Sequence, residues 1–238
     1  MPSLVGSEMC IRDSHGSSVG NEKNFFTGWI DIPLSAKGIE ESFTAGKKIA
    51  HIPLDAIFVS ELVRAQMTAF LSMSVHDSGK IPALIHQKGR KQVKWQKIFD
   101  EKIKNQILPV YTAVELNERY YGKLQGRNKD VVKKQFGYEQ VRLWRRSIDV
   151  PPPGGESLAM TKRRVVPYFK KKILPYLQQN KNVFLVAHGN SLRSIIMYLE
   201  SLTKEEVLSI EIATGEPIGY SYHNAKWRKE DLCPKNIT

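Results

Sequence analysis

Two histidines of this chain are each followed directly by glycine, and both stand where chemistry could occur. His15 opens the polar segment HGSSVGNEKNFFTGW over residues 15–29, and His188 lies near the end of the apolar run NVFLVAHGN over residues 182–190. An imidazole can act as a nucleophile or exchange a proton near neutral pH. Taken singly, each histidine is better explained as a structural residue that satisfies a backbone group. Their neighbours therefore decide the interpretation.

The residues around the two histidines favour an anion-binding site. Asn21, Thr27 and Gly28 provide small polar groups and amides after His15, and Arg64 follows a second apolar run. Backbone amides and bidentate arginine side chains both bind phosphate. Together these residues predict a phosphate pocket.

Short apolar runs that alternate with helical patterns must position these side chains. DAIFVS at residues 55–60 and NVFLVAHGN at residues 182–190 are typical of buried strands, and a helical pattern follows each of them. A further helix is predicted over residues 35–50, where Ser35 can cap the first turn. Strands that alternate with helices predict an α/β layered domain with a largely parallel sheet, whose ligands bind at the carboxyl ends of the strands.

Length and composition indicate one soluble domain with an anionic ligand. The chain has 238 residues, 41% of them hydrophobic, and no apolar run approaches the roughly 20 residues of a membrane span. A formal net charge of +12 favours negatively charged partners, but the sequence has no recognition-helix, zinc-finger or aromatic RNA-binding motif. Cys10 and Cys233 match no metal-ligand or disulfide spacing and favour a reducing compartment. We therefore expect a small anionic ligand, no nucleic acid, no membrane and no metal.

A polar and basic segment near residues 72–110 fits the alternating plan poorly. It contains HQKGRKQVKWQKIFDEKIKNQ and has few periodic apolar positions. Such a segment is predicted to leave the core as a solvated flap.

Five motifs, in order along the chain, resemble those of the cofactor-dependent phosphoglycerate mutases of the histidine phosphatase superfamily. They are HGSSVGNEKNFFTGWIDIPLS at residues 15–35, SELVRAQMTA at 60–69, LNERYYGKLQGRNK at 116–129, LWRRSIDVPPPGGESL at 143–158 and VAHGNSLR at 186–193. The resemblance runs from His15 to about Tyr222, and the third and fourth motifs distinguish the mutases from the simpler phosphatases. It implies a three-layer α/β/α sandwich with a mostly parallel central sheet.

The resemblance also implies a reaction, the interconversion of 2-phosphoglycerate and 3-phosphoglycerate in glycolysis and gluconeogenesis, primed by 2,3-bisphosphoglycerate and without a metal. His15 matches the histidine that becomes phosphorylated. His188 matches a second histidine whose cationic form would stabilise the transferring phosphoryl group, and Glu118 matches the acid/base residue. The positions that match substrate-binding residues are Ser18, Asn21, Thr27, Gly28, Arg64, Tyr121, Lys129, Arg145, Arg146, Gly189 and Asn190.

Two of these assignments have simpler explanations. Glu118 could form an ion pair with the adjacent Arg119, and Arg145 with Arg146 could lie on a solvated helix face. The motifs that flank them favour catalysis in the first case and anion binding in the second.

The chain departs from the family pattern by an insertion. Arg64 and Glu118 are 54 positions apart, about twice the separation in compact members of the family. The basic segment near residues 72–110 is therefore predicted to be an insertion in a single domain over residues 15–238, most simply a solvated loop.

A second departure lies immediately before His15. The family has an apolar strand that ends in arginine there, whereas this chain has MCIRDS, with Ser14 at the arginine position. Arg12 is two residues away, which displaces its side chain along a strand by roughly 6 to 7 Å. Because the match is dense from His15 onward and absent before it, we expect residues 1–14 to be non-native and the chain as written to be impaired.

Alternatives to the mutase remain open at this point. One is a bisphosphoglycerate synthase or phosphatase on the same scaffold, and another is a catalytically inactive, anion-binding relative, for which Ser14 is the sole argument. The resemblance further implies a homodimer or homotetramer in the cytoplasm, and a plastid stays open if a native N-terminus is missing.

Overall fold

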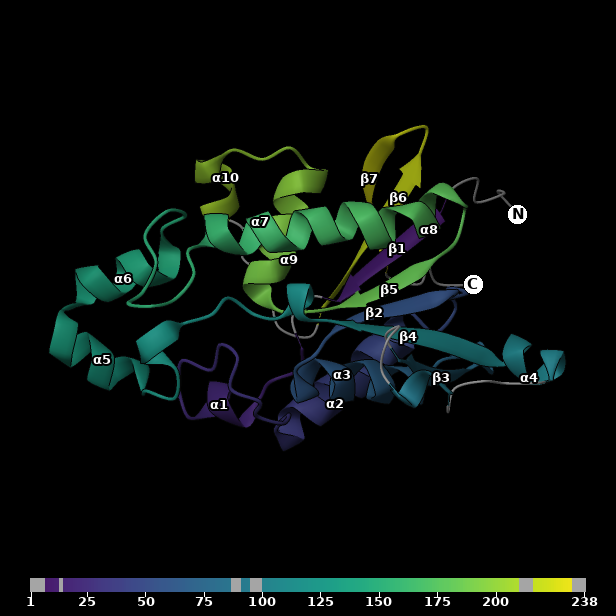
Figure 1. Cartoon of the computed structure of the whole chain (residues 1–238), viewed down its shortest axis with the longest axis horizontal. Helices are drawn as coiled ribbons and strands as arrows, with labels where there is room; N and C mark the ends of the chain where they lie inside the picture. The colour runs from purple at the N-terminus through teal and green to yellow at the C-terminus, as the bar shows by residue number, and fades with distance from the viewer. Residues whose placement is uncertain (1–6, 13–14, 87–90, 95–99, 210–215, 233–238) are drawn as a thin grey trace, which may run out of the picture.

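The computed structural model describes residues 7–12, 15–86, 91–94, 100–209 and 216–232. In these residues a seven-stranded sheet runs through the centre of the molecule (Figure 1). Its strands are β1 (Ser7–Arg12), β2 (Ala56–Ser60), β3 (Ile81–Ile85), β4 (Ile107–Ala113), β5 (Val183–Val186), β6 (Pro217–His223) and β7 (Lys226–Glu230). Their order across the sheet is β3-β4-β2-β5-β1-β6-β7.

The sheet is mostly parallel, as the sequence predicts. Parallel pairings join β3, β4, β2, β5 and β1, and antiparallel pairings add β6 and β7 at one edge. Every residue of β2 and of β5 is buried. Continuous burial is expected for parallel strands that have helices on both faces, which explains why these two strands read as unbroken apolar runs.

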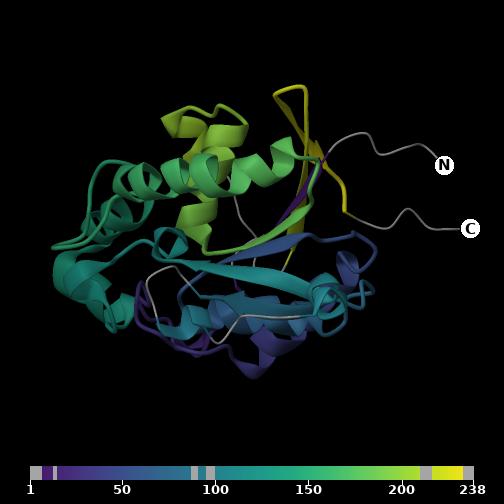
Figure 2. The same cartoon turned by 45° about the vertical axis from the view of Figure 1, so that its right-hand side comes forward.

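Helices form a layer on each face of the sheet, and the two layers are clearest in Figures 1 and 2. The α-helices are α1 (Val19–Glu22), α2 (Ala36–Lys48), α3 (Val63–Met73), α4 (Glu101–Asn105), α5 (Lys129–Phe136), α6 (Tyr138–Arg146), α7 (Leu158–Tyr168), α8 (Leu174–Gln178), α9 (Gly189–Leu199) and α10 (Lys204–Ser209). A π-helical turn, Phe169–Ile173, joins α7 to α8. Ser35 caps α2 by accepting a hydrogen bond of 3.3 Å from the Gly38 amide, as predicted.

Two apolar clusters hold the three layers together. Phe58 and Leu185 pack toward the face covered by α7, α8 and α9, whereas their neighbours Ile57 and Phe184 pack toward α3 and the segment after α2. Successive side chains of a strand point to opposite faces, so each central strand contributes to both clusters. This arrangement confirms the predicted three-layer α/β/α sandwich.

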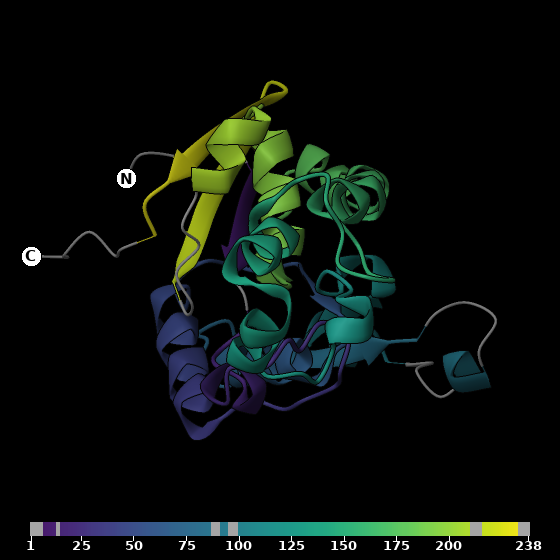
Figure 3. The ribbon, with the colours of Figure 1, turned by 90° about the vertical axis from the view of Figure 1, so that its left-hand side faces the viewer.

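The register of the parallel strands aligns their carboxyl ends. Val186 of β5 pairs with Val59 of β2 and with Arg12 of β1, and Val59 pairs with Thr112 of β4. The segments that follow these four strands therefore start at the same edge of the sheet. Helices α5 and α6 lie beyond this edge and stand toward the viewer in Figure 3.

Only part of the basic segment near residues 72–110 leaves the sheet. β3 and the first half of β4 fall inside it and pair with each other, and β4 also pairs with β2. The predicted flap is therefore wrong for these two strands. Between them, α4 is exposed over its whole length, and residues 87–90 and 95–99 lie outside the described residues.

Strand β1 lies inside the sheet, between β5 and β6. Its backbone pairs along Met9–Arg12 with β5 and along Ser7–Arg12 with β6. Ser14, whose identity led us to expect an impaired chain, lies outside the described residues, as do residues 1–6 and Asp13. The non-native origin of residues 1–14 stays a prediction.

Candidate active site

The aligned strand ends bring the predicted catalytic residues together. β1 leads to His15, β2 to Arg64 in α3, β4 to Glu118, and β5 to His188 at the start of α9. The rings of His15 and His188 are 5.0 Å apart between centroids. Four segments that are distant in sequence thus converge at the edge where an α/β sheet binds its ligands.

Two hydrogen bonds fix the tautomer of His15. Its Nδ1 lies 2.6 Å from the carbonyl oxygen of Gly16, which can only accept, so Nδ1 carries the proton. Its Nε2 accepts a hydrogen bond of 2.9 Å from Nε of Arg64. Because a guanidinium can only donate, Nε2 keeps its lone pair. The buried imidazole therefore presents an unprotonated nitrogen next to a cation.

Arg64 is fully buried and held by backbone groups of the segment that follows His15. Its Nη1 donates to the carbonyl oxygen of Ile30 at 2.9 Å and its Nη2 to that of Gly28 at 2.7 Å. Burial lowers the pKa of the guanidinium to about 10, while the negative charges of Glu118 and Asp31 oppose this shift. Arg64 remains a cation at neutral pH.

Gly28 contributes to this site through its backbone conformation. Its φ of +50° is in the left-handed region, which strongly favours glycine. A Cβ atom at this position would lie 2.3 Å from Oε1 of Gln125, which accepts a hydrogen bond of 2.7 Å from the Trp29 amide. The turn therefore directs the Gly28 carbonyl toward Arg64.

His188 is neutral in this structure. It has no exposed surface, its Nε2 lies 2.7 Å from Oγ of Ser60, and its Nδ1 has no hydrogen-bond partner among the described residues. Burial, followed by the positive charge of Arg64, holds its pKa well below the ordinary value. The cationic form expected from the sequence is therefore disfavoured until an anion lies beside it.

Glu118 directs its carboxylate toward the start of α9. Its Oε1 accepts hydrogen bonds from the Arg119 amide at 2.7 Å, the Asn190 amide at 3.3 Å and Nδ2 of Asn190 at 3.0 Å. The Arg119 side chain instead donates to the Tyr121 hydroxyl and the Arg145 carbonyl. The simpler explanation of Glu118 as the ion-pair partner of Arg119 is therefore wrong for the described structure.

A cationic pocket adjoins Glu118. Its lining residues are Arg119, Arg145, Arg146, Ser147, Leu158, Asn190, Arg193 and Leu208, none of which is acidic. Arg119 is 1% exposed, and its Nε and Nη1 have no hydrogen-bond partner among the described residues. A buried cation without a carboxylate partner is strongly disfavoured. Four clustered guanidinium groups make this position electropositive, which favours contact with an anionic group.

The other predicted substrate-binding residues differ in how close they lie to the histidines, Glu118 and the cationic pocket. Lys129 begins α5, and its pKa is lowered by burial and then by the nearby charge of Arg145. Gly189 begins α9 beside Asn190. Ser18 and Asn21 hydrogen-bond to each other in the cap of α1, and Thr27 is half-buried next to Gly20. The described structure does not connect Ser18, Asn21 or Thr27 to the histidines by a hydrogen bond.

Sequence reasoning missed several residues of the site. Ser60 contacts His188 and is the last residue of a predicted strand, so its position at the strand end was the available signal. Arg119 and Arg193 stand inside the quoted motifs beside predicted site residues. Arg164, on α7, lies outside all five motifs and had no sequence signal.

Neither a metal-binding cluster nor a membrane-spanning helix is present among the described residues. No group of three or more His, Cys, Asp or Glu side chains in the described part of the chain is arranged to hold a metal ion. Among the same residues, no helix has the length and apolar character that a membrane span requires.

Solved structures share the fold at low sequence identity. The chain matches an α-ribazole phosphatase from Shigella flexneri with a TM-score of 0.72 and 20% identity, covering 97% of this chain and 98% of that one. A mycobacterial glucosyl-3-phosphoglycerate phosphatase matches with a TM-score of 0.68 and 20% identity, covering 94% and 96%. Similarity at this level shows the fold alone.

Closer relatives are found among curated sequences. The model of the histidine phosphatase superfamily (branch 1) matches residues 12–86 and 96–233 and leaves residues 87–95 unmatched, inside the predicted insertion. A 2,3-bisphosphoglycerate-dependent phosphoglycerate mutase of Protochlamydia amoebophila is 53% identical over 216 residues, which is 91% of this chain and 96% of the relative. One of Chlamydia muridarum is 55% identical over 218 residues, 92% and 95%. The chain belongs to the histidine phosphatase superfamily and, within it, to the 2,3-bisphosphoglycerate-dependent phosphoglycerate mutases.

Proposed function

We propose that this protein is a phosphoglycerate mutase that interconverts 2-phosphoglycerate and 3-phosphoglycerate through phosphorylated His15. The observation that carries the proposal is the unprotonated Nε2 of His15, held against Arg64 and 5.0 Å, between ring centroids, from His188. An unprotonated imidazole nitrogen can attack phosphorus, and neighbouring donors can stabilise charge on the transferring group.

The positive charges of the described residues support a ligand with several negatively charged groups. Arg64 and His188 lie beside the proposed nucleophile, and the cationic pocket lies beyond Glu118. Bound 2,3-bisphosphoglycerate would supply the phosphoryl group that first modifies His15. We infer that the pocket arginines hold the remaining negative groups, because guanidinium groups bind both phosphate and carboxylate by paired hydrogen bonds.

Glu118 is the proposed proton carrier. When the P–O bond of the substrate breaks, the departing hydroxyl oxygen takes a proton from Glu118, and the reverse transfer returns it as the other hydroxyl attacks the phosphoryl group on His15. Oε1 of Glu118 already accepts three N–H groups, from Arg119 and Asn190. We infer that Oε2 exchanges the proton.

A bisphosphoglycerate synthase or phosphatase on this scaffold is the alternative within enzymes. The curated relatives at 53 to 55% identity are named as mutases, which favours the mutase. A homodimer or homotetramer, a cytoplasmic location and the absence of a resident metal remain part of the proposal.

The test is phosphorylation of His15. Radiolabelled 2,3-bisphosphoglycerate should label the protein, and His15→Ala should abolish the label. His223→Ala, which changes an exposed histidine at the end of β6, should keep it. Turnover of purified 3-phosphoglycerate to 2-phosphoglycerate should exceed release of inorganic phosphate. Labelling of His15→Ala would refute the role of His15 as the nucleophile. Release of inorganic phosphate as the dominant reaction would favour a phosphatase function.

A further inference from the structure

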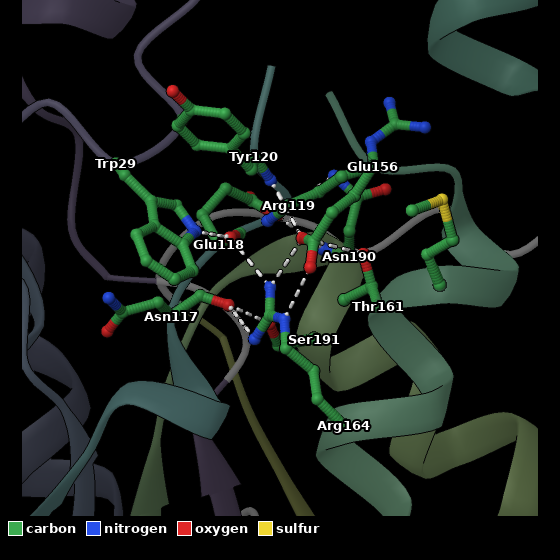
Figure 4. Close-up of polar contacts among 12 residues, drawn as sticks. Trp29, Asn117, Glu118, Arg119, Tyr120, Glu156, Thr161, Arg164, Asn190 and Ser191 are labelled. Atoms are coloured by element: carbon green, nitrogen blue, oxygen red, sulfur yellow. Dashed lines mark hydrogen bonds and ion pairs between the residues drawn. The ribbon is translucent and has the colours of Figure 1, made fainter. Parts of the chain in front are cut away.

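Arg164 uses every donor of its side chain within one small region (Figure 4). Its Nη1 donates to the carbonyl oxygens of Glu115 at 2.7 Å and Asn117 at 2.9 Å, and its Nη2 donates to that of Glu118 at 2.9 Å. Its Nε and Nη2 also donate to the two carboxylate oxygens of Glu156, both at 2.9 Å. A guanidinium has five N–H donors, so all five are used.

Three of these hydrogen bonds end on the segment that carries Glu118. Residues 115–118 follow β4 where the ladder with β2 has ended, so their carbonyl groups need partners outside the sheet. The Asn117 carbonyl also accepts from Oγ of Ser191 at 2.6 Å, and its side-chain Oδ1 accepts from the Glu61 amide at 3.0 Å. Arg164 thus joins α7 to a segment that α9 and the end of β2 also hold.

Glu156 holds the guanidinium in place from the other side. Its Oε2 accepts the Tyr120 amide at 2.9 Å as well as Nη2 of Arg164. Burial alone would raise the pKa of Glu156, but the hydrogen bonds from Arg164 and the Tyr120 amide lower it below the ordinary value. The carboxylate is therefore ionised at neutral pH, and it fixes both the arginine and the residue two positions after Glu118.

Trp29 is the second side chain that binds the backbone carbonyl of Glu118. Its Nε1 donates to the Glu118 carbonyl oxygen at 2.5 Å, the same atom that accepts from Arg164. The guanidinium carbon of Arg164 lies 5.6 Å from the Trp29 ring centroid, within the range of a cation–π contact. The main chain of Glu118 is therefore held from two directions, while Asn190 holds its carboxylate.

We propose that Arg164 is a positioning residue for proton transfer by Glu118, acting through the backbone carbonyls of residues 115–118. The proposal rests on the proposed function, in which Glu118 gives a proton to the departing hydroxyl oxygen. A displacement of about 1 Å of a catalytic group can reduce rates by ~10²-fold. Arg164 does not reach the reacting atoms in this arrangement, since all of its donors are already occupied.

The Arg164→Lys variant distinguishes positioning of Glu118 by directed hydrogen bonds from an effect of positive charge alone. Lysine keeps the positive charge and can still pair with Glu156, but its three donors cannot reproduce five directed bonds. We expect kcat for phosphoglycerate turnover to fall ~10- to 100-fold with little change in KM, because the lost contact acts on the transition state. Glu156→Gln, which weakens the hold on the guanidinium but leaves the carbonyl bonds possible, should give a smaller loss.

A second phosphoryl donor distinguishes positioning of Glu118 from general damage. p-Nitrophenyl phosphate also transfers its phosphoryl group to a nucleophile, but its phenolate leaves without needing a proton. The rate at which it phosphorylates His15 should therefore stay within ~2-fold of the unmodified protein in Arg164→Lys. Arg228→Lys, at an exposed ion pair on β7, is the control and should change neither rate.

The outcomes separate this inference from the proposed function. If the unmodified protein is not labelled at His15 by either donor, the proposed function fails. If labelling is normal but Arg164→Lys leaves kcat unchanged, or lowers both rates equally, Arg164 is only a structural residue. Thermal unfolding of each variant identifies a folding defect, and if Arg164→Lys does not fold, the same comparison of the two donors in Glu156→Gln decides the question.

Discussion

Nε of Arg64 lies 2.9 Å from Nε2 of His15, on the opposite side of the ring from the hydrogen bond to Gly16. The two contacts together leave the nucleophilic nitrogen unprotonated and place a permanent cation beside it. Arg64 itself is held by the carbonyl oxygens of Gly28 and Ile30. The turn at Gly28 thus determines the position of the Arg64 guanidinium beside His15.

Arg64→Lys is expected to slow phosphorylation of His15 by ~10²- to 10³-fold, the effect of losing one preorganised donor to a developing charge. Lysine keeps the charge but cannot bond to His15, Gly28 and Ile30 in the planar geometry of a guanidinium. Rapid-quench labelling with 2,3-bisphosphoglycerate measures the rate. Arg142→Lys, at an exposed ion pair on α6, is the control, and an equal rate in Arg64→Lys and the control would contradict the role of Arg64.

The central strands could be predicted from the sequence because burial on both faces makes them continuous apolar runs. β2 and β5 show this pattern, whereas β3 and β4 do not. β3 is an edge strand with no fully buried residue, and β3 and β4 contain Pro82 and Pro109. Proline lacks the N–H group of a ladder bond and argues against a strand. The polar and basic composition of the segment near residues 72–110, with few periodic apolar positions, predicts a flap instead of these strands.

The site was predictable where a residue type identifies its own chemistry. His15, His188 and Glu118 stand inside motifs, and the structure brings them to one edge of the sheet. Arg164 gave no such signal, because its role depends on carbonyl groups of a segment more than 40 positions away. The neutral state of His188 also depends on burial, which only the fold reveals.

Anion binding should change the protonation of His188. Burial and then the positive charge of Arg64 hold its pKa well below the ordinary value of 6.5 in the free protein. A phosphoryl analogue such as orthovanadate would add negative charge beside the ring and raise that pKa. NMR titration should show His188 neutral at pH 6 in the free protein, and its pKa should rise on binding. A normal titration near 6.5 without ligand would contradict this account.

The same residue should make stability depend on pH. Since the pKa of His188 is lower in the folded protein, the unfolded chain takes up the proton first as pH falls below about 6.5, and the free energy of unfolding decreases. Burial lowers the pKa of His76 as well, which adds to the effect. Denaturant unfolding between pH 5 and 7 should therefore show a shallower pH dependence in His188→Asn. His223→Asn, at an exposed position, is the control, and equal slopes in both variants would contradict the prediction.

Gly38 allows α2 to approach the loop that carries His15. A Cβ atom at Gly38 would lie 2.0 Å from the Ser17 carbonyl oxygen, and one at Gly16 would lie 2.2 Å from the Gly38 carbonyl oxygen. Backbone must therefore move in Gly38→Ala, although alanine favours a helix. We expect a lower thermal midpoint and a loss of turnover of ~10²-fold from displacement of His15. Glu40→Ala, at an exposed position of the same helix, should have neither effect, and normal turnover in Gly38→Ala would show that the loop adjusts without cost.

Ser14→Arg should raise mutase turnover if residues 1–14 are non-native. The family has arginine immediately before the nucleophilic histidine, and the absence of one charge-stabilising donor reduces rates by ~10²- to 10³-fold, so restoring it should recover a comparable factor. Residue 14 directly precedes His15 in the sequence. Ser74→Arg, at the exposed end of α3, adds the same charge elsewhere and is the control. The gene upstream of the His15 codon should encode an apolar strand that ends in arginine. If it encodes CIRDS and Ser14→Arg brings no gain, a catalytically inactive, anion-binding protein becomes the better explanation of this chain.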